Sequence, residues 1–190
     1  MKTTPVTPAD LAASVLSVPP LARRTDLTID SAQNARLLDH LRSGGVRTFM
    51  YGGNANLYSI GVGELGTLCD LLVSLSRDGD WIIPSVGSDY GKACDQLKML
   101  RDYPFATAMV LPHKAQSTPA GVATGIRRLA DIYGKSVIAY VKDECYVEAA
   151  DMGRLAKDGV LCAIKYAIVR EHPLKDPFLG DLVNAVDRSM

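Results

Sequence analysis

The sequence SVIAYVKDECYVEAADMGRLAKDGVLCAIKYAI (residues 136–168) contains two short apolar runs with an amphipathic segment between them. The runs at 136–141 and 160–168 are rich in aliphatic residues, which is typical of strands buried on both faces. The segment from Val147 to Lys157 has helical spacing and stops at Gly159. Two buried strands joined by a helix predict a parallel β/α/β unit.

The same alternation occurs along most of the chain. Ser31 is a candidate cap for the first long helix, and Thr118, Pro119 and Gly134 are start and stop signals for another. Further strands are expected at 15–18, 46–51, 81–87 and 106–111, and further helices at 31–41, 65–75, 91–100, 118–133 and 177–186. We therefore predict about six β/α units in one domain over residues 1–190. A closed barrel and an open doubly wound sheet share this pattern, and periodicity does not separate them.

The composition excludes several functional classes. The chain has 190 residues, with 21 Lys and Arg balanced by 21 Asp and Glu, so no net field attracts nucleic acid or an anionic membrane. No apolar run approaches the roughly 18 residues of a membrane span, and no signal peptide is expected. The cysteines form no C-x-x-C pair and the histidines are scattered, so we predict free thiols, no metal site and a cytoplasmic location.

Lys165 is the most informative candidate for chemistry. It interrupts the apolar run at 160–168, near the strand end where parallel β/α folds place their active sites. Burial disfavours the charged form of a lysine and leaves a neutral amine that can attack a carbonyl. The alternative interpretation is a strand-end lysine that reaches solvent or pairs with a carboxylate. Tyr140 ends the preceding strand and is either a proton shuttle or a core tyrosine with one hydrogen bond.

A glycine-rich loop follows the strand at 46–51. Its residues Gly52-Gly53-Asn54-Ala55-Asn56 could present backbone N–H groups to an anionic ligand, or could simply form a tight turn. The chain contains neither the G-x-G-x-x-G fingerprint nor a P-loop, so a nucleotide site is not predicted.

These positions together resemble the dihydrodipicolinate synthase and N-acetylneuraminate lyase family. The resemblance rests on five short stretches, namely Gly45-Val46 leading into the Gly53 loop, Ile83 to Gly87, Leu111-Pro112, Ala139-Tyr140 and Ala163 to Lys165. It implies a TIM-type (β/α)8 barrel whose last two units are absent from these 190 residues. It also implies an enzyme, often tetrameric, that condenses or cleaves 2-keto acids through a lysine imine.

On this resemblance Lys165 forms the imine and Tyr140 transfers protons. Gly53, Asn54 and Ala55 would hold the carboxylate of the keto acid. The implied partners are pyruvate or a related 2-keto acid, an aldehyde, and further copies of the chain in a dimer or tetramer. No metal or organic cofactor is expected, because the protonated imine is itself the electron sink.

The chain departs from the family pattern at three places. The loop Gly-Thr-Thr-Gly-Glu appears here as Gly53-Asn54-Ala55-Asn56-Leu57, without either threonine. The second tyrosine of the family's proton relay falls at His113-Lys114, and the arginine five positions after the catalytic tyrosine is replaced by Cys145, with Lys142 the nearest cation. We therefore expect a Schiff-base lyase or aldolase that is not dihydrodipicolinate synthase itself. The alternatives are a hydrolase, dehydratase or decarboxylase using the same imine, or a non-catalytic binding or assembly subunit.

Overall fold

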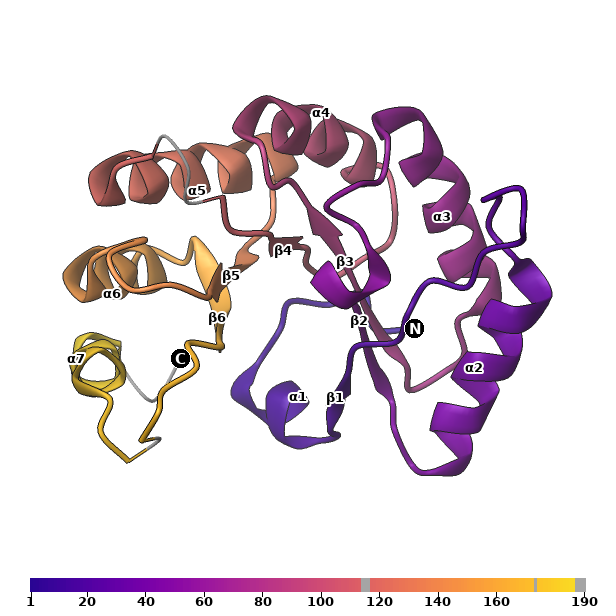
Figure 1. Cartoon of the computed structure of the whole chain (residues 1–190), viewed down its shortest axis with the longest axis horizontal. Coiled ribbons are helices and arrows are strands. Elements are labelled where there is room, and N and C mark those ends of the chain that lie inside the picture. The colour runs from indigo at the N-terminus through magenta and orange to yellow at the C-terminus, as the bar shows by residue number, and fades with distance from the viewer. Residues whose placement is uncertain (114–116, 173, 187–190) are drawn as a thin grey trace.

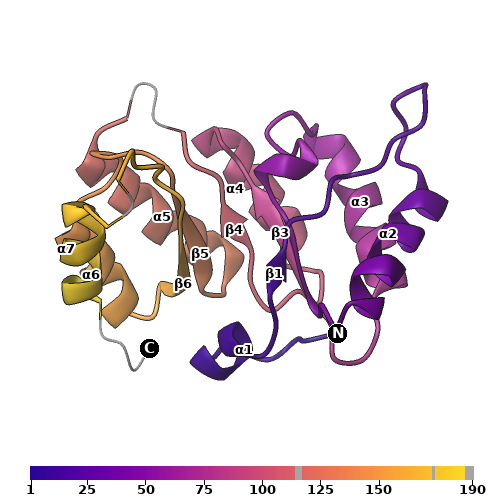
Figure 2. The ribbon, with the colours of Figure 1, turned by 60° about the horizontal axis from the view of Figure 1, so that its bottom comes forward.

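The structure, a computed structural model, describes residues 1–113, 117–172 and 174–186. Its centre is a parallel sheet of six strands in the order of the sequence. The strands are β1 (Leu16–Ser17), β2 (Thr48–Tyr51), β3 (Trp81–Val86), β4 (Met109–Val110), β5 (Val137–Val141) and β6 (Leu161–Tyr166). The sheet is curled, with β1 and β6 at its two ends (Figures 1 and 2). Because the strand order never reverses, the fold is a partial barrel and not a doubly wound sheet.

Helices cover the outer face of this curled sheet (Figure 1). They are α2 (Ser31–Ser43), α3 (Val62–Leu75), α4 (Tyr90–Leu100), α5 (Pro119–Tyr133), α6 (Ala149–Lys157) and α7 (Pro177–Ala185). All six were predicted from the sequence. Two short elements were not, namely α1 (Pro8–Ala12) and the 3-10 turn η1 (Gly53–Ala55).

The ends of the helices follow local capping chemistry. Thr118 accepts a hydrogen bond from the Gly121 N–H at the start of α5, and Gly134 ends that helix in the left-handed region at φ +72°, both as predicted. The predicted cap of α2 is wrong by one residue. Ser31 is the first helical residue, and the side chain of Asp30 before it accepts the Gln33 N–H.

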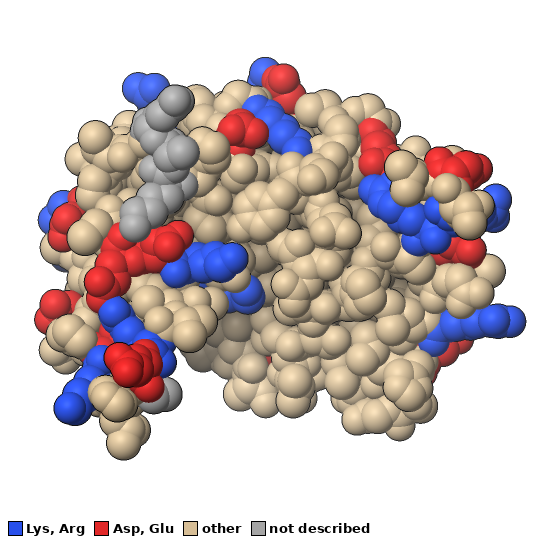
Figure 3. Space-filling view, viewed as in Figure 1, with Lys and Arg blue, Asp and Glu red and all other residues tan. Residues whose placement is uncertain are grey.

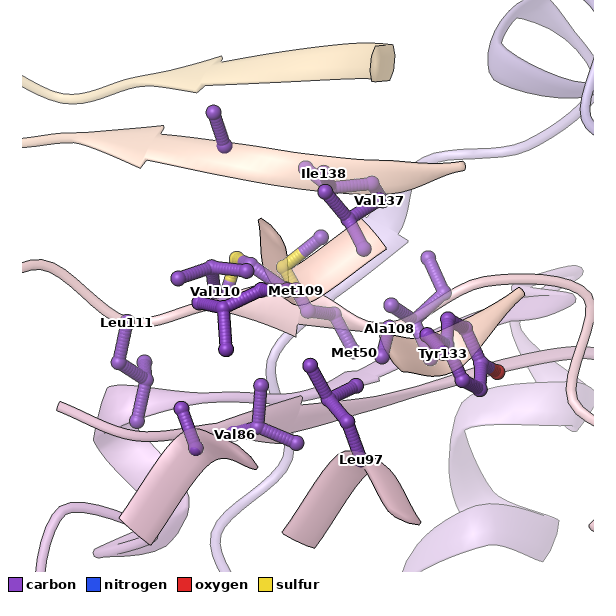
Figure 4. Close-up of a cluster of buried hydrophobic side chains, with 14 of the residues drawn as sticks. Met50, Val86, Leu97, Ala108, Met109, Val110, Leu111, Tyr133, Val137 and Ile138 are labelled. Atoms are coloured by element: carbon purple, nitrogen blue, oxygen red, sulfur yellow. The ribbon is translucent and has the colours of Figure 1, made fainter. Parts of the chain in front are cut away.

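The middle strands are buried on both faces, which explains their continuous apolar sequences. Figure 4 shows part of this core, where Val86, Met109 and Ile138 of the sheet lie with Leu97 of α4 and Tyr133 of α5. β4 is shorter than the predicted strand at 106–111, because only Met109 and Val110 pair with both neighbouring strands. The four cysteines Cys69, Cys94, Cys145 and Cys162 are free, as predicted.

β6 differs from the strands before it. Leu161 is buried, but the five residues from Cys162 to Tyr166 are only half-buried. Within the described residues β6 pairs with β5 alone, so its other edge has no neighbouring strand. The prediction of a strand buried on both faces is therefore wrong for β6, and its apolar sequence lies at an open edge of the sheet.

The close packing of α6 on α7 gives a test of this arrangement. A methyl group on Gly153 of α6 would collide with the backbone carbonyl of Ala185, whereas one on Gly180 of α7 would meet nothing within 4 Å. We expect Gly180→Ala to raise the free energy of unfolding by about 0.5–1 kcal/mol through helix propensity. Gly153→Ala gains the same propensity but should lower it overall, because overpacking costs about 1–3 kcal/mol. Urea unfolding of the two variants checks this, and equal effects would show that α7 does not pack on α6 as described.

Candidate active site

Lys165 and Tyr140 lie next to each other at the carboxyl ends of β6 and β5. They are register partners in the parallel ladder, and Lys165 Nζ lies 3.5 Å from the centroid of the Tyr140 ring. The ammonium group therefore rests on the ring face in a cation–π contact. The two residues singled out for chemistry are thus brought together by the fold. Lys165 is half-buried and not buried as expected, because β6 is at the edge of the sheet.

The glycine-rich loop forms η1, directly after β2. Asn54 is exposed and Ala55 is buried, while Asn56 takes a left-handed conformation at φ 57°, which asparagine tolerates better than most residues. The Ala55 N–H donates to the Gly52 carbonyl at 3.0 Å, so the turn itself uses this N–H. Of the three residues predicted to hold a carboxylate, Ala55 thus has its donor already engaged.

Tyr58 links this loop to the other tyrosines at the strand ends, and sequence reasoning did not single it out. A Cβ atom on Gly53 would lie 2.9 Å from the Tyr58 ring, so the ring packs directly on the glycine. Lys92 Nζ donates to the Tyr58 carbonyl at 2.8 Å. Burial raises the pKa of the Tyr58 phenol, and the charges of Tyr140, Tyr146 and Asp143 raise it further. The Tyr58 ring therefore packs on the loop that follows β2.

His113 occupies the end of β4, where the family pattern has a tyrosine. Its Nδ1 lies 3.4 Å from Ser88 Oγ and 3.7 Å from Asp89 Oδ1. Lys114, the other residue predicted at this position, is outside the described residues.

A cavity of about 390 Å³ lies between α5 and the end of β4. Its walls are largely apolar and include Val122, Ile126 and Leu129 of α5, with His113 and Tyr146 among its polar lining groups. None of the described residues that line it is a lysine. Neither Lys165 nor Tyr140 is among the described residues that line this cavity.

A network of polar side chains fixes the end of β6. Tyr166 Oη donates to Asp176 Oδ2 at 2.7 Å, and Arg170 Nη2 donates to Asp176 Oδ1 at the same distance. Asp176 also accepts the Leu179 N–H at 3.0 Å, which caps α7. Arg170 in addition binds Glu144 in the loop after β5. The network thereby ties β6, immediately beyond Lys165, to α7 and to that loop.

The lowered pKa of the Asp176 carboxyl predicts that the stability of the fold depends on pH. Hydrogen bonds from Arg170 hold its pKa well below the usual range, with Tyr166 and the Leu179 N–H acting in the same direction. A carboxyl whose pKa is lower in the folded state stabilises the fold above its unfolded pKa of about 3.9, and this stabilisation is lost as the pH falls toward the folded value. We expect Asp176→Asn to be less stable than the wild type at pH 7, with a difference that shrinks steadily below pH 4. Thermal unfolding between pH 7 and pH 2 measures it, and a constant difference would contradict this account.

Figure 3 shows Lys and Arg interspersed with Asp and Glu toward the edges of this face, with a largely uncharged centre. None of the helices in the described part of the chain is long and apolar enough to cross a membrane.

No protein-family model and no curated protein matches the chain. Several solved structures do. Dihydrodipicolinate synthase from Bacillus clausii matches 95% of this chain at a TM-score of 0.79 and 19% identity. The chloride-inhibited dihydrodipicolinate synthase from Acinetobacter baumannii, complexed with pyruvate, matches 94% at a TM-score of 0.79 and 17% identity. YagE of Escherichia coli K12, a prophage protein of the dihydrodipicolinic acid synthase family in complex with pyruvate, matches 91% at a TM-score of 0.75 and 16% identity.

The match covers nearly all of this chain but only part of each solved structure. The chain spans 60% of the Bacillus clausii enzyme, 62% of the Acinetobacter baumannii enzyme and 59% of YagE. The resemblance noted in the sequence is therefore confirmed at the level of fold. This chain has a partial (β/α) barrel fold of the kind found in dihydrodipicolinate synthase, with six parallel strands.

Proposed function

We propose that this chain carries the imine-forming site of a lyase or aldolase that acts on pyruvate or a related 2-keto acid. The observation that supports this most directly is the contact of Lys165 Nζ with the Tyr140 ring at the carboxyl ends of adjacent strands. The two similar structures that were solved with pyruvate support the choice of a keto acid.

In this proposal the uncharged amine of Lys165 attacks the keto carbon and forms a carbon–nitrogen bond. The carbonyl oxygen takes up protons and leaves as water, which gives a protonated imine. Tyr140 donates and accepts protons in these steps. Loss of a proton from the carbon next to the imine then gives an enamine, which adds to the carbonyl carbon of an aldehyde. Gly53 and Asn54 hold the carboxylate of the keto acid.

Two residues in the loop after β5 bear on whether the aldehyde carries a carboxylate. Cys145, which replaces the arginine of the family pattern, is exposed, and Lys142 beside it is exposed as well. Because a planar arginine fork is absent at this place, the site does not favour an aldehyde that carries a carboxylate. A second candidate function is hydrolysis, dehydration or decarboxylation through the same imine. Ala55 favours this second candidate. The family pattern has threonine hydroxyls in this loop, and alanine has no hydroxyl to transfer protons.

Reductive trapping tests the proposal. The chain is incubated with pyruvate and borohydride, its intact mass is measured, and the modified peptide is mapped. We expect a single reduced adduct on the peptide that contains Lys165. If pyruvate gives none, a panel of other 2-keto acids is tried on a chain shown to be folded, and the absence of any adduct would contradict the proposal.

Lys135 provides an internal competitor in the same experiment. Burial lowers its pKa, so its amine is more reactive than that of an ordinary surface lysine. It lies just before β5, at the other end of the strand from Tyr140, and donates to the Tyr103 and Phe105 carbonyls. An adduct on Lys135 in place of Lys165 would show that reactivity follows burial alone and would contradict the proposed site.

A further inference from the structure

Ser85 has a buried hydroxyl group without a hydrogen-bond partner among the described residues. The residue is only 1% exposed, and its Oγ makes none of the hydrogen bonds found in this part of the chain. Buried hydroxyls are nearly always paired, because an unpaired one loses its bonds to water without replacement. The unpaired Ser85 hydroxyl is therefore available to bind a ligand.

The ladder places Ser85 on the same face of the sheet as Lys165. Ser85 pairs with Met109, Met109 with Ile138, and Ile138 with Ala163. Because side chains alternate along a strand, residues two positions further on face the same side. Tyr140 and Lys165 are those residues on β5 and β6. Ser85 therefore lies one layer below the candidate imine site, on the inner face of the curled sheet.

Beside Ser85, the place that a side chain at position 52 would take is filled by the flexible side chain of Met109. A Cβ atom on Gly52 would lie 3.6 Å from Ser85 Oγ and 2.8 Å from Met109 Cε. The thioether end of Met109 thus fills the place that a side chain at position 52 would take. Methionine has three rotatable bonds and repacks easily, so this cover can move aside for a small ligand.

We propose that Ser85 is a positioning residue whose hydroxyl donates a hydrogen bond to the carboxylate of the keto acid bound at Lys165. The inference rests on the proposed function. In the loop, Ala55 has no hydroxyl and uses its N–H within the turn, so it offers no hydrogen bond to the carboxylate. Ser85 lies on the neighbouring strand, close to Gly52 at the start of that loop. Its hydroxyl donates this hydrogen bond to the carboxylate from the layer below the imine site.

Ser85→Ala is the direct test, because it removes one oxygen atom and leaves the packing nearly unchanged. The rate of reductive trapping is measured against pyruvate concentration for the wild type and the variant. A hydrogen bond to a charged group predicts an increase of about tenfold or more in the half-saturating concentration. Thermal unfolding without ligand should show equal or higher stability, since the variant loses an unpaired buried hydroxyl.

Two comparisons make the result specific. Acetone has the reacting carbonyl of pyruvate but no carboxylate, so Ser85→Ala should leave its trapping unchanged. Ser74→Ala on α3 is the matched control, because the Ser74 hydroxyl is exposed and already donates to the Leu71 carbonyl. It should behave as the wild type with both compounds.

The outcomes separate this inference from the proposed function. If the wild type is trapped at Lys165 and Ser85→Ala half-saturates at the same pyruvate concentration, the role of Ser85 is refuted and the imine site stands. A lower unfolding temperature with unchanged half-saturation would show that the hydroxyl is purely structural and would also refute it. If the wild type forms no reduced adduct at all, both the proposed imine site at Lys165 and the role of Ser85 are refuted.

Discussion

Lys165→Met is expected to abolish the pyruvate–borohydride adduct. Methionine keeps the length of the lysine side chain but has no amine, and an imine can form only on a primary amine. The same variant should exchange the methyl protons of pyruvate with deuterated water at least about 10³-fold more slowly, because loss of a nucleophile removes the whole covalent route. Nuclear magnetic resonance of the pyruvate methyl signal measures this exchange, and mass spectrometry measures the adduct.

The fold should survive this substitution. Lys165 is half-buried and makes its described contact through the Tyr140 ring, which a thioether can also pack against. Lys142→Met is a suitable control, since Lys142 follows β5 two residues after Tyr140 and is exposed. It should keep both the adduct and the exchange. Full adduct formation in the Lys165→Met variant would place the reacting amine elsewhere.

The pairing of Lys165 with Tyr140 was predictable, because each residue lies toward the carboxyl end of one of two consecutive apolar runs. Consecutive strands of a β/α fold are usually neighbours, so their ends meet. The half-burial of Lys165 was not predictable in this way. It depends on which strand, if any, lies beyond β6, and no local pattern in the sequence reports that.

Tyr58 and Ser85 show a second limit of the sequence. The position of Tyr58 depends on how η1 turns the chain after β2, and the sequence indicated only a tight loop there. Ser85 lies in the stretch Ile83 to Gly87 that contributes to the family resemblance, but the sequence alone gives it no particular role. Only the full set of hydrogen bonds shows that its hydroxyl has no described partner.

Helix ends were predicted correctly where only one residue has a strong preference for the capping position. Thr118 and Gly134 bound α5 because each has a strong preference for its position. At the start of α2 both Asp30 and Ser31 are good caps, and the sequence does not choose between them. Alternation alone left the fold open between barrel and doubly wound sheet, since strand order is a long-range property that alternation does not encode. The family resemblance implied the barrel, and the strand order confirms it.

Asp80→Ala should cause the largest loss of stability among single substitutions remote from the site. Asp80 is completely buried just before β3, and Arg42 of α2 binds it through Nε at 3.2 Å and Nη2 at 2.5 Å. The Arg77 N–H also donates to Asp80, at 2.8 Å. Removing Asp80 leaves the buried side of the Arg42 guanidinium unpaired, with only the exposed Asp39 still bound to it at 2.9 Å. Breaking a buried ion pair in this way costs about 3–5 kcal/mol. Urea unfolding should show this loss in the free energy of unfolding.

A double variant separates the cost of leaving Arg42 unpaired from the net contribution of the Asp80–Arg42 ion pair to stability. Replacing both partners, in Asp80→Ala with Arg42→Met, removes the unpaired charge and should recover much of the stability, because well-packed apolar groups often replace a buried pair without penalty. Asp95→Ala breaks an exposed pair with Lys98 and should cost no more than about 1 kcal/mol. If the double variant is as unstable as Asp80→Ala, the carboxylate acts through its bond to the Arg77 backbone. Asp80 lies before β3, at the opposite end of the sheet from the imine site, so the stability lost here should leave the position of trapping on Lys165 unchanged in the folded fraction.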